Sequence, residues 1–195
     1  MKKELVSQII VDALLTFSAI VCVLSMFGAA VCMGKHLEHY WWAIAGIAVY
    51  VVFARYVGAW KNGFILKLQL QAVRSFVGLL LGRKISKFVI TDGTDFGHMS
   101  MQNSDHLVIR LAPYCLLLFP LLLLAIKMLF PNSAQWLTGL VGFSLAIQLH
   151  SIYKYLDSEF KNIALKNKYR ELCIIITILS TCLGLIIYGI YLTRV

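Results

Sequence analysis

Charged residues are scarce in this sequence. Asp, Glu, Lys and Arg together make up 14% of the chain, against about 25% in soluble globular domains. Hydrophobic residues reach 60%, and the mean hydropathy is +0.80. They are gathered in runs close to the roughly 20 residues that cross a bilayer as a helix. The scarcity of charge excludes an ordinary soluble domain, and the sequence predicts a single integral membrane domain over residues 1–195.

Acidic residues are the rarer of the charged groups, which leaves a formal net charge of +9. Such a charge would suggest nucleic acid in a soluble protein. In a membrane protein, however, basic residues flank the spans on the cytoplasmic side. We therefore expect no nucleic-acid partner. The partners we expect are membrane lipids and another membrane protein.

Recognisable catalytic patterns are also lacking. The five cysteines show no C-x-x-C spacing, and there is no G-x-S-x-G, P-loop or dinucleotide-binding motif. His36, Glu38 and His39 lie together, but two histidines and one carboxylate in a polar turn are a weak zinc signal. The sequence thus predicts no catalytic residue, no cofactor and no metal.

Long apolar runs are abundant, and five of them predict full membrane spans: residues 5–33, 41–60, 111–130, 136–155 and 172–192. Pro120 lies inside the third span and should kink it. A further stretch, residues 65–81, contains too many polar residues to face lipid all round. We therefore predict an all-α polytopic membrane protein with five spans and one embedded or re-entrant helix. Six spans are the alternative.

Two polar segments interrupt this pattern. Residues 84–109 alternate in polarity and contain the turn signal Asp92-Gly93, which predicts a small β-hairpin of two or three strands at the membrane surface. Residues 65–110 would then form one unit of embedded helix and hairpin. Residues 156–171 are predicted to be a basic cytoplasmic loop.

The distribution of basic residues predicts the orientation. If residues 65–81 do not cross the bilayer, most Lys and Arg residues share one side, and only Lys35, Lys127 and Arg194 face the other. The positive-inside rule then places the N-terminus in the cytoplasm and the C-terminus outside, in the plasma (inner) membrane.

A few polar side chains inside apolar runs are candidates for a functional centre. Asp12 is a carboxylate well inside a predicted span, and such a group usually has a partner. We predict an ion pair between Asp12 and Arg55, which should lie at a matching depth in an antiparallel neighbour. His150 also needs a hydrogen-bond partner, and a structural role is favoured over a ligand role. The predicted intramembrane polar centre comprises Asp12, Arg55, Gln71, Arg74, His150 and Asn162.

The order of elements from Ile65 to Ile163 resembles the membrane core of the site-2-protease-like zinc metallopeptidases. The resemblance rests on a helix ending LLLGRKISKFVI, a glycine-containing hairpin with FGHMSM, and the apolar stretch LAPYCLLLFPLLLL. It implies an H-E-x-x-H zinc motif on the helix before the hairpin and a liganding aspartate after the span predicted at residues 136–155.

This chain departs from the family at the residues that bind the metal. The positions of the two histidines hold Leu70 and Arg74, the position of the glutamate holds Gln71, and the aspartate position holds Asn162. Leucine cannot bind zinc, and arginine would repel it. The resemblance therefore implies a degenerate member that cannot hydrolyse peptides by the zinc route, with Gln71 and Arg74 filling the vacated polar centre.

Two functions remain open at this point. The first is a non-catalytic membrane protein, a metallopeptidase-like pseudoenzyme that acts as a subunit or regulator by binding another membrane protein. The alternative is a membrane enzyme or transporter that uses a polar cavity formed by Asp12, Arg55, Arg74 and His150. A sensor or lipid-binding subunit that presents loop 161–170 to anionic headgroups is a third possibility.

Overall fold

The structure is a computed structural model that describes residues 2–56, 64–83, 85–88, 99–101, 107–130, 134–160 and 165–193. Within these residues the chain is helical apart from two short strands. The elements are α1 (Lys2–Lys35), α2 (Leu37–Tyr56), α4 (Phe64–Leu80), β1 (Ile85–Phe88), β2 (Met99–Met101), α5 (Leu107–Cys115), α6 (Leu118–Leu129), α7 (Ala134–Phe160) and α8 (Leu165–Leu192). The prediction of a predominantly helical protein is confirmed.

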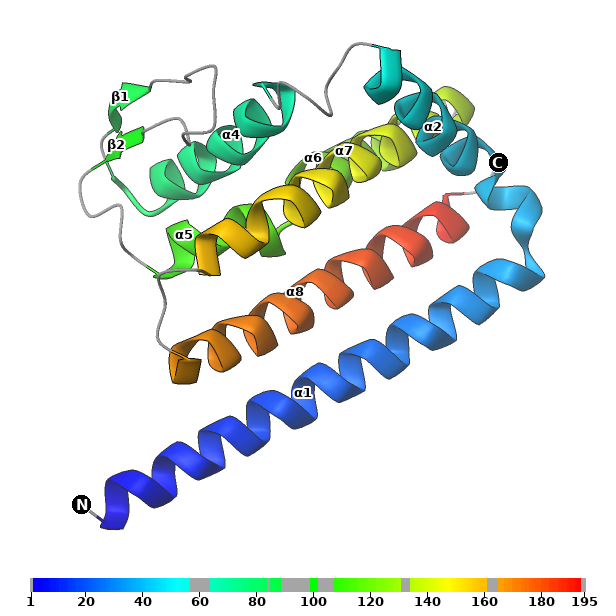
Figure 1. The fold of residues 1–195 in the computed structure, drawn as a ribbon. Coiled ribbons are helices and arrows are strands. Elements are labelled where there is room, and N and C mark those ends of the chain that lie inside the picture. Colours follow the sequence, from blue (N-terminus) through cyan, green and yellow to red (C-terminus); the bar gives the residue numbers. More distant parts are fainter. Residues whose placement is uncertain are drawn as a thin grey trace.

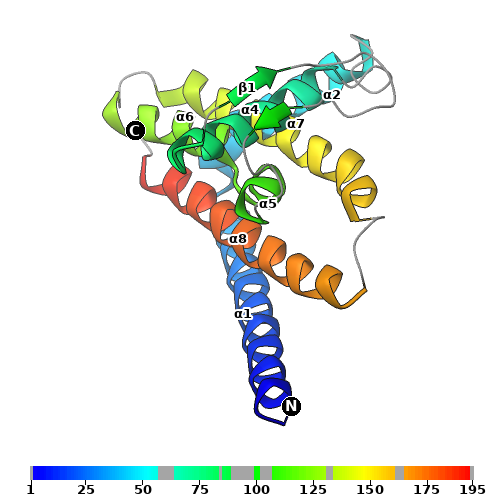
Figure 2. The ribbon, with the colours of Figure 1, turned by 90° about the vertical axis from the view of Figure 1, so that its left-hand side faces the viewer.

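Helix α8 packs against α1, α5 and α6. Helix α1 lies along one side of α8, and α5, α6 and α7 lie on its other side (Figure 1). Helix α4 and the two strands lie beyond them, on the side of the molecule farthest from α1. Figure 2 shows that α1 extends away from the other helices, with only part of its length beside them.

Small residues allow α2 and α7 to approach each other closely. A Cβ added at Gly46 would lie 1.9 Å from the carbonyl oxygen of Gly139, and one at Gly142 would lie 2.0 Å from that of Ala43. Glycine is therefore required at both positions of this crossing, as is common where membrane helices pack backbone to backbone.

The number of membrane spans differs from the prediction. Two stretches, Val11–Lys35 and Lys168–Leu192, are helices long and apolar enough to cross a membrane, and α5 with α6 adds a third if this bent pair counts as one span. The apolar part of α2, Tyr40–Tyr56, is shorter than a span needs. Length and composition of the described helices thus support two or three spans, and the five-span count is not supported.

The predicted kink at Pro120 is confirmed, and its cause can be read from the backbone. Helices α5 and α6 meet at an angle of 63°, and the break lies at Leu116 and Leu117. Proline has no N–H, so Pro120 cannot donate to the carbonyl of Leu116 one turn earlier. The side chain of Gln148 on α7 donates a hydrogen bond to that carbonyl, and the N–H of Leu118 donates another at 2.9 Å.

The predicted helix 65–81 is present as α4, and its end has a clear cause. Gly82 has a φ of 68°, the left-handed conformation that favours glycine. The N–H of Gly82 donates to the carbonyl of Leu79, and the N–H of Arg83 donates to that of Gly78. This pair of bonds is a Schellman motif, which terminates the helix.

The two polar segments were predicted with different success. Strands β1 and β2 pair antiparallel, with Ile85 opposite Met101 and Phe88 opposite Met99. Residues 89–98, which would connect them, lie outside the described residues, so the hairpin at a membrane surface stays a prediction. The loop predicted for residues 156–171 is largely helical, because α7 continues to Phe160 and α8 begins at Leu165. Lys, Glu and Leu are strong helix formers, which accounts for this extension.

Candidate functional site

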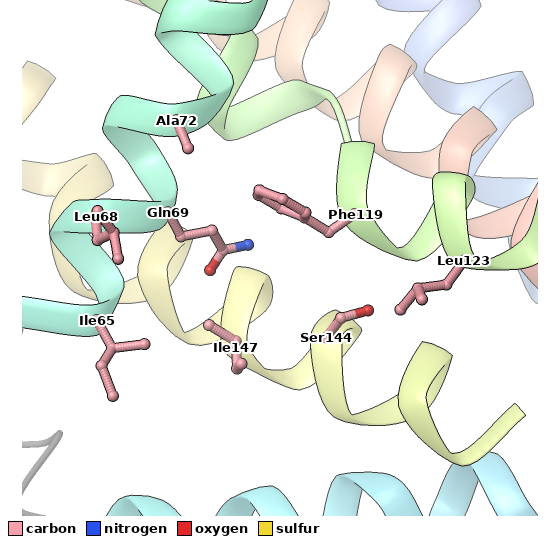
Figure 3. Close-up of a pocket in the computed structure, with 8 residues that line it drawn as sticks. All are labelled: Ile65, Leu68, Gln69, Ala72, Phe119, Leu123, Ser144 and Ile147. Carbon is pink, nitrogen blue, oxygen red and sulfur yellow. The ribbon is translucent and has the colours of Figure 1, made fainter. Parts of the chain in front are cut away.

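A pocket of about 530 Å³ lies between α4, α6 and α7 (Figure 3). Its surface is apolar throughout, although a glutamine and a serine are among the residues that line it. The lining residues are Ile65, Leu68, Gln69 and Ala72 of α4, Phe119 and Leu123 of α6, and Ser144 and Ile147 of α7. A volume of ~300–1,000 Å³ with an apolar wall and few polar groups is typical of ligand-binding pockets.

The polar residues of α4 position this helix against the rest of the protein. Lys67, Gln69 and Gln71 are buried, whereas Leu68 and Leu79 on the same helix are exposed. Leu66, Leu70 and Val73 are buried as well, so the inward side of this helix combines polar and apolar residues. Several polar residues of this stretch thus pack against the rest of the protein, and its position in the membrane stays a prediction.

Gln69 is a buried polar residue at the edge of the pocket. Its side chain is 9% exposed, and its Oε1 lies 3.3 Å from Ser151 Oγ of α7, which donates the hydrogen bond. In Figure 3 the amide points from α4 into the pocket, toward the ring of Phe119. Among the described residues nothing accepts a hydrogen bond from the Nε2 group of Gln69. The hydrogen bond to Ser151 thus connects α4 to α7 beside the pocket.

Positive charge lies beside this glutamine. Lys154 follows Ser151 by about one turn of α7, and Lys67 precedes Gln69 on α4. Lys154 also lies 5.8 Å from the centroid of the Tyr155 ring. The site is therefore an apolar pocket, with a hydrogen bond between Gln69 and Ser151 beside it.

Asp12 does have an ion-pair partner, but it is not the predicted one. Arg170 of α8 donates from Nε to Asp12 Oδ1 at 2.6 Å, and from an Nη atom to Oδ2 at 3.2 Å. The prediction of an Asp12–Arg55 pair is wrong. Helix α1 packs along α8 and touches α2 only briefly, so Arg55, an exposed residue near the end of α2, is not the neighbour of Asp12.

His150 forms the hydrogen bond that its position requires. Its Nδ1 lies 2.6 Å from the Tyr50 hydroxyl of α2, and the two rings are in edge contact. Of the remaining predicted residues, Gln71 is buried and Arg74 is half-buried on α4. Asn162 lies outside the described residues.

The structure does not gather the predicted polar centre around one cavity. Asp12 lies in the contact between α1 and α8, whereas His150 lies in the contact between α2 and α7. Gln71 and Arg74 belong to α4, on the far side of the molecule from α1 (Figure 1). These side chains therefore connect separate pairs of helices.

Sequence reasoning missed several polar residues that connect helices. Arg110 of α5 forms an ion pair with Glu171 of α8, next to the Arg170 that binds Asp12. Gln148 is 1% exposed and binds the carbonyl at the α5–α6 break. The signal for Gln148 was Pro120, since a proline inside a helix leaves a carbonyl that another group must satisfy.

Helix α1 presents a second, largely uncovered surface. Only 6% of its most apolar stretch is buried within the protein, against 39% for α8. Ala19, Thr16 and Cys22 face α8, where Thr16 meets Tyr169 and Cys22 lies 3.7 Å from Thr181. Gly28 lies on the opposite side of α1, and a Cβ added there would meet nothing within 4 Å.

No protein-family model matches this chain, and neither a curated protein nor a solved structure matches it. The resemblance to the zinc metallopeptidases therefore stays a prediction. Within the part of the chain that the structure describes, no three His, Cys, Asp or Glu residues are grouped in a way that could hold a metal ion.

Proposed function

We propose that this chain is a non-catalytic integral membrane protein that acts as a subunit or regulator by binding another membrane protein. The observation that carries the proposal is the uncovered surface of α1. This helix is long and apolar enough to span the membrane, yet only 6% of its most apolar stretch is buried. We assign that surface to one transmembrane helix of the partner.

Small residues on α1 support a helix, rather than lipid alone, as the occupant. Ser25 and Gly28 are exposed, and Ala29 lies one turn from Ser25. Gly28 has open space around it on the side turned away from α8. Membrane helices associate through such small residues because their backbones can then approach closely. A helix that faced only lipid would gain nothing from them.

The proposed topology has five crossings and a cytoplasmic N-terminus, in the plasma (inner) membrane. In support, α1 and α8 run in the same direction, since Asp12 pairs with Arg170 and Cys22 lies beside Thr181. The bent pair follows α8 from the Arg110–Glu171 ion pair toward the contact of Leu124 with Gly189. Helices α2 and α7 would provide the two return crossings, and the N-terminal ends of α1 and α8 carry basic residues.

We also propose that α4 to α7 form the metallopeptidase-like part of a pseudoenzyme. In its favour, α4 is followed by two paired strands and a proline-broken helix, and Gln69 of α4 meets Ser151 of α7. The resemblance places its zinc ligands at Leu70, Arg74 and Asn162, and none of these side chains binds zinc in that family.

A photo-crosslinking residue at Leu24 tests the docking surface, because Leu24 is 65% exposed and lies one turn from Gly28. In intact membranes we expect crosslinks to one integral membrane protein, identified by mass spectrometry. The substitution Gly28→Leu should abolish them, because its side chain blocks close approach. Ala48→Leu, at an exposed position of α2, is the matched control and should leave the crosslinks unchanged.

Three outcomes contradict the proposal. Crosslinks to lipid alone would show that α1 has no protein partner. Crosslinks to a second copy of this chain would show self-association. Crosslinks that survive Gly28→Leu would show that the partner does not dock where α1 is uncovered.

A further inference from the structure

The break between α5 and α6 has the backbone geometry of a hinge. Leu117, the residue at the break, has φ −78° and ψ 60°, and the N–H of Leu118 donates to the carbonyl of Leu116 at 2.9 Å. This combination is an inverse γ-turn, a common low-energy conformation of a single residue. The φ of Leu117 already lies near the helical value of about −63°, so a rotation of about 100° in ψ alone would bring this residue into the α-helical conformation.

The bent and the straight conformation satisfy different hydrogen bonds. In the bent state the Leu116 carbonyl accepts from Gln148 of α7 and from Leu118. A continuous helix would return the Leu118 N–H to the carbonyl one turn earlier, while Pro120 would still leave Leu116 without a helical donor. The bent state, in turn, leaves Gln148 Oε1 buried without a partner among the described residues. Because neither conformation satisfies every polar group, we expect a small difference in free energy between them.

The apolar pocket lies across this break. Helix α4 packs on α5, and the two helices share a small apolar core of Val73, Val77, Ile109 and Ala112. Helix α6 packs instead on α7 and α8. Figure 3 shows the lining residues of α4 on one side of the pocket and Phe119 of α6, just after the break, on the other. The angle between α5 and α6 therefore affects the distance between these two walls.

We propose that Leu117 is a hinge whose straightening changes the width of the pocket between α4 and α6, with Gln148 as the latch that holds the bent state. Hinges are a few positions at the ends of elements that absorb a change in φ and ψ, and Leu117 connects the end of α5 to the start of α6. The hinge does not depend on the partner at α1 or on the number of spans, so its failure would leave the proposed function standing.

The test uses the full-length protein in lipid nanodiscs, with spin labels on non-natural residues that replace Phe76 of α4 and Leu122 of α6. Both side chains are exposed and lie outside the pocket. Electron paramagnetic resonance then measures the distribution of distances between the two helices. Gln148→Met removes the latch and should raise the ratio of straight to bent molecules about fivefold, as expected for the loss of one hydrogen bond. Leu118→Pro should leave only the bent state, because proline disfavours the helical conformation in the residue before it and is tolerated at the first position of a helix.

A second pair of labels, at Leu122 of α6 and Leu140 of α7, is the matched control. These two helices pack together on the same side of the break, so their distance should be the same in every variant. Pro120→Ala restores an N–H that can donate to Leu116 in a straight helix, and it should also raise the straight population. This variant keeps the test decisive if Gln148→Met does not fold.

Two results would overturn the hinge. The same α4–α6 distribution in Gln148→Met, Pro120→Ala, Leu118→Pro and the unaltered protein would show that the break is rigid. A change in both label pairs would show a general rearrangement of the helices rather than a movement at Leu117.

Discussion

Gln148→Met is predicted to destabilise the protein because Gln148 satisfies a carbonyl that Pro120 leaves without its helical donor. Methionine keeps the length and shape of glutamine but cannot donate to the Leu116 carbonyl. Leaving a buried polar group unsatisfied costs about 1–3 kcal/mol, and hydrogen bonds between membrane helices average about 0.6 kcal/mol. The Leu116 carbonyl keeps the bond from Leu118, and the change also removes Gln148 Oε1, a buried atom without a partner among the described residues. We therefore expect a loss of about 1 kcal/mol in the free energy of unfolding.

The assay is unfolding of the purified protein in mixed micelles with increasing dodecyl sulfate. Gln135→Met, at an exposed position of the same helix, is the control and should change the free energy of unfolding by less than about 0.5 kcal/mol. A double-mutant cycle with Pro120→Ala isolates the mechanism. Alanine restores an N–H at residue 120, so Gln148→Met should cost less in that background, with a coupling of about 0.5 kcal/mol or more. Additive losses would refute the role given to Gln148.

The remaining predictions concern helix packing and topology. Reversing the charges of the ion pair, with Asp12→Arg and Arg170→Asp together, should recover stability that either change alone loses. Each single loss should be small because the pair is partly exposed, and an unrecovered double variant would contradict the pairing. Gly46→Ala should prevent accumulation of folded protein, since its Cβ would overlap the Gly139 carbonyl, while Gly28→Ala should accumulate normally. Equal expression of both would contradict the close α2–α7 crossing. A reporter fused to the N-terminus should be cytoplasmic and one fused to the C-terminus external, and reporters on the same side would contradict five crossings.

Local features of the fold were predictable where one residue determines the backbone. Pro120 lies well inside its apolar run, where its missing N–H and its ring disfavour a continuous helix whatever the neighbouring helices are. Gly82 ended the helix for a similar reason, through its left-handed conformation. The burial of Gln71 and Lys67 on α4 followed from the cost of exposing such residues to lipid.

Contacts between helices could not be predicted in this way. The depth of Asp12 indicated that it needs a partner, but depth is the same for every neighbouring helix. Arg55 was chosen because α2 follows α1 in the chain, whereas α1 packs on α8 and meets Arg170. The pocket likewise depends on how α4, α6 and α7 pack, and the position of Gln69 in the sequence does not predict it.

The metal content of the purified protein tests the central claim most directly. We propose that the chain acts by binding another membrane protein and has no zinc centre. Leu70, Gln71 and Arg74 occupy the positions of the zinc motif that the resemblance implies. Elemental analysis after dialysis against a mild chelator should find far less than one zinc per chain. One tightly held zinc per chain would contradict the account.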